Sequence, residues 1–161
     1  MSNNASKSGG LSKNTLIIGV IVAIAVIWGI SAYNGMASQE DQATTAWAQV
    51  QSTYQRRADL IPNLVNVVKG YAAHESETFE RVVNARSRAT QITIDADSLT
   101  PERLQQFQQA QGELSQALGR LIAIQESYPE LKANENFMDL QKQLESTENR
   151  INEARNTFHT A

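Results

Sequence analysis

Residues 56–75 read "RRADLIPNLVNVVKGYAAHE", an apolar-rich run with a proline at its centre and charged or titratable residues at its edges. The run contains residue types that perform catalysis, namely Arg57, Asp59, His74 and Glu75. It is also typical of a joint between two helices of a structural bundle. The choice between a catalytic segment and a joint decides both the fold and the class of protein.

Pro62 determines where the first helix of the domain ends. A helix that ran through Pro62 to about Ala73 would be nearly twice as long as the remainder up to Ala89. If Pro62 instead begins a new helix, with Asp59 near its N-terminal cap, the helices have similar lengths, which favours an antiparallel bundle. The three-four spacing of apolar residues crosses Pro62 unbroken, as in a kinked helix, so a turn near His74 is the alternative. We favour the turn at Pro62.

Helical periodicity dominates residues 38–161. Apolar side chains recur at spacings of three and four in three stretches, and strand-like alternation is confined to the short "QITID". The sequence therefore predicts an all-α protein, with an antiparallel four-helix bundle at 38–161. The periodic positions include Trp47, Val50, Tyr54, Ile61, Leu64, Val68, Leu104, Phe107, Leu114, Leu118, Leu121, Phe137, Leu140, Leu144, Ile151 and Phe158.

Proline and capping residues mark the breaks between these helices. Thr100 can accept a hydrogen bond from an unpaired amide, and Pro101 has no N–H to satisfy, so together they predict a helix start. The stretch 90–97 before them is predicted to be a loop. Further on, Pro129 ends one helix and Asn134 can cap the next.

The segment Leu16–Ala32, "LIIGVIVAIAVIWGISA", contains no charged residue. At 1.5 Å per residue it reaches about 26 Å, close to the thickness of a bilayer core. Trp28 and Tyr33 suit the interfacial region, where aromatic rings are enriched. We predict a transmembrane helix at 15–33 behind a disordered polar tail at 1–14. A cleaved signal peptide is the alternative, but its apolar region is usually shorter.

Charge gives an orientation for this anchor. Lys7 and Lys13 are the only charged residues before it, which leaves 12 basic and 17 acidic residues after it, a net charge of −5. Basic residues resist translocation. We therefore predict a cytoplasmic N-terminus and a bundle on the outer side of the membrane. The acidic domain also disfavours nucleic acid as a partner.

The residue inventory does not organise a catalytic or metal site. His74 and Glu75 begin an H-E-x-x-H pattern, but the second histidine is missing and the only other one is His159. "DADSLTPE" resembles a calcium loop but has Thr100 where the loop needs glycine. There is no cysteine and no Glu-x-x-His pair. We therefore expect no catalytic residue, no metal and no cofactor.

Polar residues at or beside the apolar positions are more informative. A buried charge must be paired or hydrogen-bonded. We favour the interpretation that opposite charges on neighbouring helices satisfy each other and fix the register of the bundle, with Arg57 and Glu75 as the pair to mutate first. The alternative is a polar ligand pocket, which requires these groups to be unpaired in the free protein. The candidate residues are Arg57, Glu75, Arg86, Gln111, Gln125, Thr147, Glu148 and Arg155.

Small residues form a row, Gly112, Ser115 and Gly119, beside a leucine stripe. Each glycine costs about 1 kcal/mol of helix propensity, so a compensating contact is expected. We favour close packing against another helix of the same bundle over a subunit interface. In the membrane segment, Ala25 and Gly29 form a small-xxx-small pair that weakly suggests dimerisation.

The order of several strings behind one N-terminal apolar segment resembles the LemA family of bacterial membrane proteins. The resemblance spans about Tyr33–Phe158, and its specific strings are "RRADLIPNLV", "YPELKANENF" and "TENRI". It implies a single-pass protein with an antiparallel four-helix domain, no established enzymatic activity, and a scaffold or adaptor role. Relatives are often encoded beside membrane metalloproteases, and a distant magnetosome relative acts in membrane remodelling. The resemblance also implies an external N-terminus and a longer C-terminal tail than this sequence has.

Three functional hypotheses follow. The first is a non-catalytic, membrane-anchored helical scaffold or adaptor that forms a homo-oligomer or binds a membrane-protein partner, with a membrane metalloprotease as the partner that the resemblance suggests. The second is a ligand-sensing bundle that acts through a partner. The third is a metal-dependent hydrolase, which the residue inventory does not support.

Overall fold

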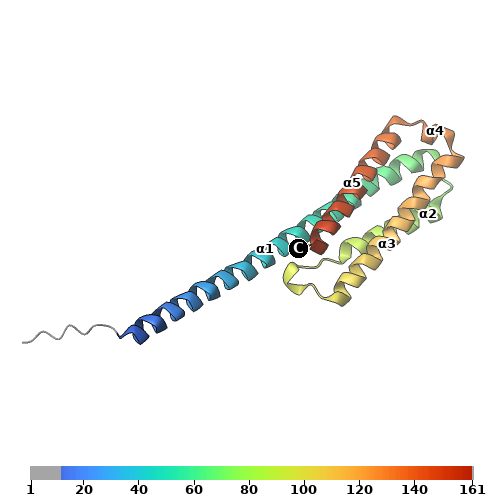
Figure 1. Ribbon diagram of the computed structural model, residues 1–161. Helices are drawn as coiled ribbons and strands as arrows, with labels where there is room; N and C mark the ends of the chain where they lie inside the picture. Colours follow the sequence, from blue (N-terminus) through green and yellow to red (C-terminus); the bar gives the residue numbers. More distant parts are fainter. Residues whose placement is uncertain (1–11, 161) are drawn as a thin grey trace, which may run out of the picture. The chain divides into compact units, whose positions relative to one another are not determined.

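The structure, a computed structural model, describes residues 12–160, and every regular element in that range is helical (Figure 1). The predicted all-α class is confirmed. The predicted tail falls mainly on residues 1–11, which lie outside the described range. The elements are α1 (Lys13–Tyr71), α2 (Ser76–Gln91), α3 (Pro101–Ala123), α4 (Pro129–Lys132) and α5 (Glu135–Thr160), with 3₁₀ turns at Ala96–Ser98 and Ile124–Ser127.

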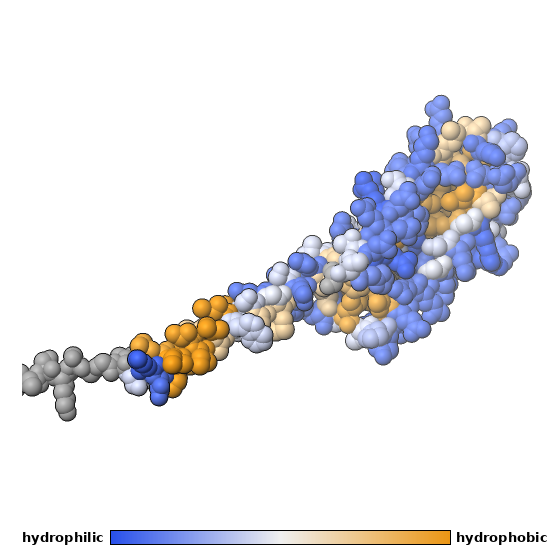
Figure 2. Space-filling view, viewed as in Figure 1, coloured by the Kyte–Doolittle hydropathy of each residue, from blue (hydrophilic) through white to orange (hydrophobic). Residues whose placement is uncertain are grey.

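The chain divides within α1 into two units, one up to Asp41 and the other from Gln42 onward. The described part of the first unit is an exposed helix, and its apolar residues form a continuous hydrophobic stretch in Figure 2. By length and composition it is able to cross a membrane, because its most apolar window has a mean hydropathy of 2.5 and none of that window is buried. Trp28 is 76% exposed.

The second unit is the bundle, formed by the last part of α1 together with α2, α3 and α5 (Figure 1). The chain reverses between α1 and α2 over residues 72–75, and α2 packs along α3. Apolar side chains from all four helices make the core, with Leu131 of α4 also buried in it. The predicted antiparallel four-helix bundle is therefore present.

Pro62 corrects one prediction: it lies inside α1, and the turn comes ten residues later, near His74. A proline in a helix interior leaves the carbonyl four residues before it without a donor, here that of Ala58. Arg86 of α2 supplies the missing donor, because its Nε donates to the Ala58 oxygen at 2.8 Å. Since α1 continues to Tyr71, the predicted match of helix lengths also fails.

The predicted capping residues are confirmed. The Thr100 side chain accepts a hydrogen bond from the amide of Arg103, and Pro101 occupies the first turn of α3. The Asn134 side chain accepts from the amide of Phe137 at 2.9 Å and donates to the Tyr71 hydroxyl at 2.8 Å. Asn134 therefore starts α5 and also fastens its first turn to the last turn of α1.

The connection between α2 and α3 is fixed to α1 by a tryptophan. Trp47 is 2% exposed, and its indole Nε1 donates to the Ile94 carbonyl at 2.8 Å. Gln51, one turn later, donates to the same oxygen. The predicted loop is thus an ordered, partly buried connection rather than a solvated one, and it closes one end of the bundle.

Candidate functional site

A polar layer divides the interior of the bundle. The structure has a large apolar core around Leu64, Val68 and Phe137 and a small aromatic-rich core around Trp47 and Phe107. On three helices, the position between a small-core residue and a large-core residue is buried and polar. These positions are Arg57 between Tyr54 and Ile61 on α1, Gln111 between Phe107 and Leu114 on α3, and Thr147 between Leu144 and Ile151 on α5.

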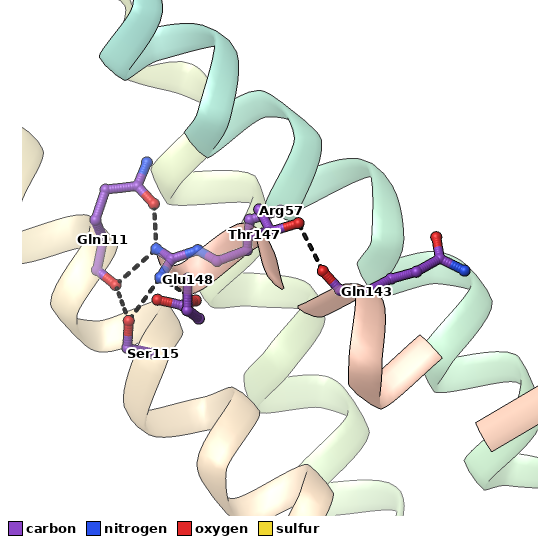
Figure 3. Close-up of polar contacts among 6 residues, drawn as sticks. All are labelled: Arg57, Gln111, Ser115, Gln143, Thr147 and Glu148. Atoms are coloured by element: carbon purple, nitrogen blue, oxygen red, sulfur yellow. Dashed lines mark hydrogen bonds and ion pairs between the residues drawn. The ribbon is translucent and has the colours of Figure 1, made fainter. Parts of the chain in front are cut away.

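Arg57 is the centre of this layer and is 1% exposed (Figure 3). Its Nη1 donates to the Ser115 hydroxyl at 2.7 Å and to Glu148 Oε1 at 3.0 Å. Its Nη2 donates to the Gln111 carbonyl at 3.1 Å and to the Gln111 side-chain oxygen. One buried arginine therefore joins α1 to α3 and α5 through four contacts.

The charge of Arg57 is balanced by Glu148, whose side chain is 40% exposed. Removing one member of a buried pair strands the other charge, whereas the intact pair fixes how the helices align. Thr147 is also buried, but its hydroxyl donates to the Gln143 carbonyl of its own helix at 2.7 Å. The Arg57 layer thus agrees with the register interpretation, because both terminal nitrogens of Arg57 are paired, while its buried Nε has no partner among the described residues.

Glu75 does not belong to the layer, although it was predicted as a polar core or interaction residue together with Arg57. It lies half-buried at the turn before α2, where its carbonyl accepts the amides of Thr78 and Phe79. Gln125 lies in the 3₁₀ turn after α3, where its carbonyl accepts the Tyr128 amide, and it makes no contact with the layer. Both residues mark chain reversals rather than the middle of the bundle.

Arg155 borders the layer from α5. Its side chain is exposed, and its charge lies close enough to Tyr54 to lower the pKa of that phenol. Burial acts in the opposite direction and is the larger effect, so the pKa of Tyr54 is raised above its ordinary value. Tyr54 also lies beside Arg57, whose guanidinium carbon is 5.1 Å from the centre of the tyrosine ring.

The two glycines of the small-residue row of α3 meet open space, so their predicted close packing against another helix of the bundle is wrong, although the Ser115 hydroxyl accepts from Arg57 of α1. A Cβ added at Gly112 or Gly119 would meet no atom within 4 Å, and Ser115 is exposed. The leucine stripe of α3 turns toward the core and the adjacent row turns away from it. Within residues 12–160, nothing compensates the helix propensity that the two glycines lose.

Two cavities adjoin the polar layer. The larger, about 450 Å³, lies between α1, the end of α2, the following loop and α3, and its walls include Gln51, Gln55, Thr90 and Asp95. The smaller, about 140 Å³, lies between α1, α3 and α5 beside Gly112. Within residues 12–160, no three His, Asp or Glu side chains are grouped so that they could hold a metal.

Sequence reasoning missed two residues of this site. Ser115 was assigned only to the small-residue row, although it lies one turn after Gln111 and therefore beside it. Its hydroxyl also donates to the Gln111 carbonyl at 3.0 Å, which places its oxygen where Arg57 can reach it. Tyr54 was counted as an ordinary core residue, but it lines both cavities.

These features define a class: helical-bundle proteins with a buried polar layer and one apolar N-terminal helix that could span a membrane. Within this class, the model of the LemA family matches residues 46–161, and the chain belongs to that family. It is also similar to Protein LemA of Metamycoplasma hominis, with 22% identity over 144 residues, 88% of this chain and 62% of that relative. The chain therefore spans less than two thirds of the curated relative it matches.

Proposed function

We propose that the protein is a non-catalytic, membrane-anchored helical adaptor that docks a membrane-protein partner on the outward face of α3. The observation that supports this most directly is the open row of Gly112, Ser115 and Gly119. Glycine in an exposed helix costs about 1 kcal/mol relative to alanine, so two glycines without a neighbour are an unexplained loss of stability. A helix that packs closely on this row would explain them.

Two further features suit an adaptor. The polar layer is paired internally, so the bundle offers a rigid surface rather than a mobile one. The apolar part of α1 would confine the bundle to the membrane surface, where partners with membrane segments are concentrated. We take the bacterial inner membrane as the location and, from the charges around the anchor, the cytoplasm for the N-terminus.

Alanine substitutions test the docking face. G112A/G119A should stabilise the free protein by about 1 kcal/mol per site, because each added methyl enters open space. The same change should reduce the complex recovered after in-membrane crosslinking and pull-down. G70A is the matched control: Gly70 is an exposed glycine of α1 with equally open surroundings, so it should stabilise without affecting recovery. Equal recovery from G112A/G119A and G70A would refute the docking face.

Cysteine labelling tests the orientation. Cysteines placed at Ser8 and Ser76 should differ in their reaction with a membrane-impermeant thiol reagent applied to intact cells. Position 76 should react and position 8 should be protected. Reaction at position 8 alone would reverse the orientation and agree with the one that the resemblance implies.

A ligand-sensing bundle is the second candidate, and the larger cavity favours it. Its volume of about 450 Å³ lies within the range of small-molecule sites. A thermal-shift screen of the full chain against a metabolite panel should then find a stabilising compound. Ser52→Trp would fill the cavity from α1 and should abolish that shift. A panel without any stabilising compound would count against this candidate and leave the adaptor.

A further inference from the structure

The smaller cavity adjoins the row on α3, and it combines an exposed arginine with a buried one. Gly112 and Ser115 line it from α3, Tyr54 and Arg57 from α1, and Arg155 from α5. We propose that this cavity, the Arg155 pocket, binds the carboxylate of an Asp or Glu side chain on a helix of a different protein. The proposal rests on the proposed function, because that helix would lie along the row.

The charges of the pocket favour an anion. Two arginines and one glutamate line it, a net charge of +1, in a part of the chain whose net charge is −5. Arg57 and Glu148 already form a pair at 3.0 Å. Arg155 has no carboxylate within ion-pair distance among residues 12–160. Its planar guanidinium acts on the Tyr54 hydroxyl by charge and by a hydrogen bond, and its other N–H groups are available for the hydrogen bonds that arginine makes to carboxylate.

Two more donors lie around the pocket. Tyr54 lines the pocket, and its hydroxyl is protonated at neutral pH, so it can donate to an oxygen of the incoming carboxylate. The Nε of Arg57 is buried and has no partner among the described residues. A buried donor without a partner costs free energy, and a water or a ligand oxygen that reaches it would remove that cost.

The volume of the pocket and the acidic residues of α3 indicate which molecule can occupy it. A volume of about 140 Å³ is below the roughly 300–1,000 Å³ of small-molecule sites, so the pocket suits the end of one side chain. A second copy packed row to row would not supply it. The acidic residues of α3 are Glu102, in its first turn, and Glu113, which pairs with Arg88 at 3.0 Å. We therefore assign the carboxylate to a different protein.

Carbodiimide crosslinking of the full chain in native membranes tests the occupant. In the R155K variant, the reagent would join the new amine to a bound carboxylate as an amide, with loss of water. The yield should exceed that of R150K at least about tenfold, because a docked carboxylate has a millimolar effective concentration. Arg150 is exposed on the same helix but does not line the pocket.

Mass spectrometry decides between the outcomes. The proposal requires a product mapped to an Asp or Glu of another protein and lost when Gly112→Leu is added to R155K. Equal yields from R155K and R150K, a product confined to Glu148 of the same chain, or a product joining two copies would overturn it. If G112A/G119A still weakens the complex while R155K gives no product, the docking face stands and the pocket assignment fails.

Small probes test the chemistry of the pocket without the partner. In NMR spectra of the detergent-solubilised full chain, sodium acetate should shift the Arg155 Nε–H and Gly112 amide signals in a saturable way, while acetamide should not. R155Q should abolish the shift at Gly112. An acetate response at Gly112 that is unchanged in R155Q, or a response equal to that with acetamide, would refute carboxylate binding at this site.

Discussion

Two arginines stabilise the same turn of α1 in different ways. Arg57 belongs to α1 itself, whereas Arg86 of α2 contacts the next residue of α1, Ala58. Arg57 is almost completely buried, and it contacts a carboxylate, a hydroxyl and both oxygens of one glutamine. Arg86 is half-buried, and its Nε donates to the Ala58 carbonyl that Pro62 leaves unpaired. The first needs a counter-charge, and the second serves as a substitute for a backbone donor. Polar residues on an apolar stripe thus fix register in one case and repair a helix in the other.

Removing the counter-charge should have the largest effect. E148A leaves the Arg57 guanidinium buried without its carboxylate, so the free energy of unfolding should fall by about 3 kcal/mol. Chemical denaturation of the full chain in detergent measures this change. R57M should cost less, because the Glu148 left behind is 40% exposed and water can solvate it.

Glu145 provides the matched control for this prediction. It is an exposed glutamate one turn earlier on α5, and no ion pair joins it to another of the described residues. E145A should change the free energy of unfolding by less than about 0.5 kcal/mol. If E148A and E145A cost the same, Glu148 does not balance a buried charge and the comparison above fails.

A double-mutant cycle tests the repair of α1. R86A should cost about 1–2 kcal/mol, because the buried Ala58 carbonyl loses its donor. In a P62A background, residue 62 has its own N–H, so the same R86A change should cost about 1 kcal/mol less. The free energies of unfolding of the four proteins give the coupling.

Arg88 is the control for the cycle because it lies two residues further along α2 and makes an exposed ion pair with Glu113. Exposed pairs contribute about 0–1 kcal/mol, and R88A should cost the same with or without Pro62. A coupling free energy of zero between Arg86 and Pro62 would mean that water already donates a hydrogen bond to the Ala58 carbonyl.

The sequence predicted what depends on spacing along one helix. Three-four periodicity gave the all-α bundle, and it placed Arg57, Gln111 and Thr147 on apolar stripes. It could not give the partner of Arg57, because Glu148 depends on the rotation and register of another helix. The interior proline was misjudged for the same reason: the donor that makes Pro62 tolerable comes from Arg86, 24 positions later in the chain.

The outward orientation of the small-residue row depends on a similar detail. Gly112 directly follows Gln111, and one residue rotates a helix by about 100°, which is enough to turn a position from the core to the surface. Periodicity therefore located the row beside the leucine stripe but did not decide which side it faces. The cavity beside it, formed by residues of three helices, had no signal in any single stretch of sequence.

Tyr54 should give the smallest effect, and it appears only at high pH. Burial raises the pKa of its phenol above the ordinary value of 10.0, against the opposing charges of Arg155 and Arg57. Above that ordinary value, the unfolded chain releases the tyrosine proton while the folded protein retains it, so the free energy of unfolding falls as pH rises.

Y54F removes this contribution but keeps the other tyrosines. At pH 7, Y54F should change stability by less than about 1 kcal/mol. Between pH 9 and 11, the mutant should become progressively more stable relative to the parent, as denaturation curves at each pH would measure. A constant difference between the two proteins over this range would mean that Tyr54 ionises as readily in the bundle as in the unfolded chain. At neutral pH the Tyr54 hydroxyl would still be protonated in that case, because the ordinary value of 10.0 lies well above pH 7, so the Arg155 pocket and the Arg57 layer would be unaffected.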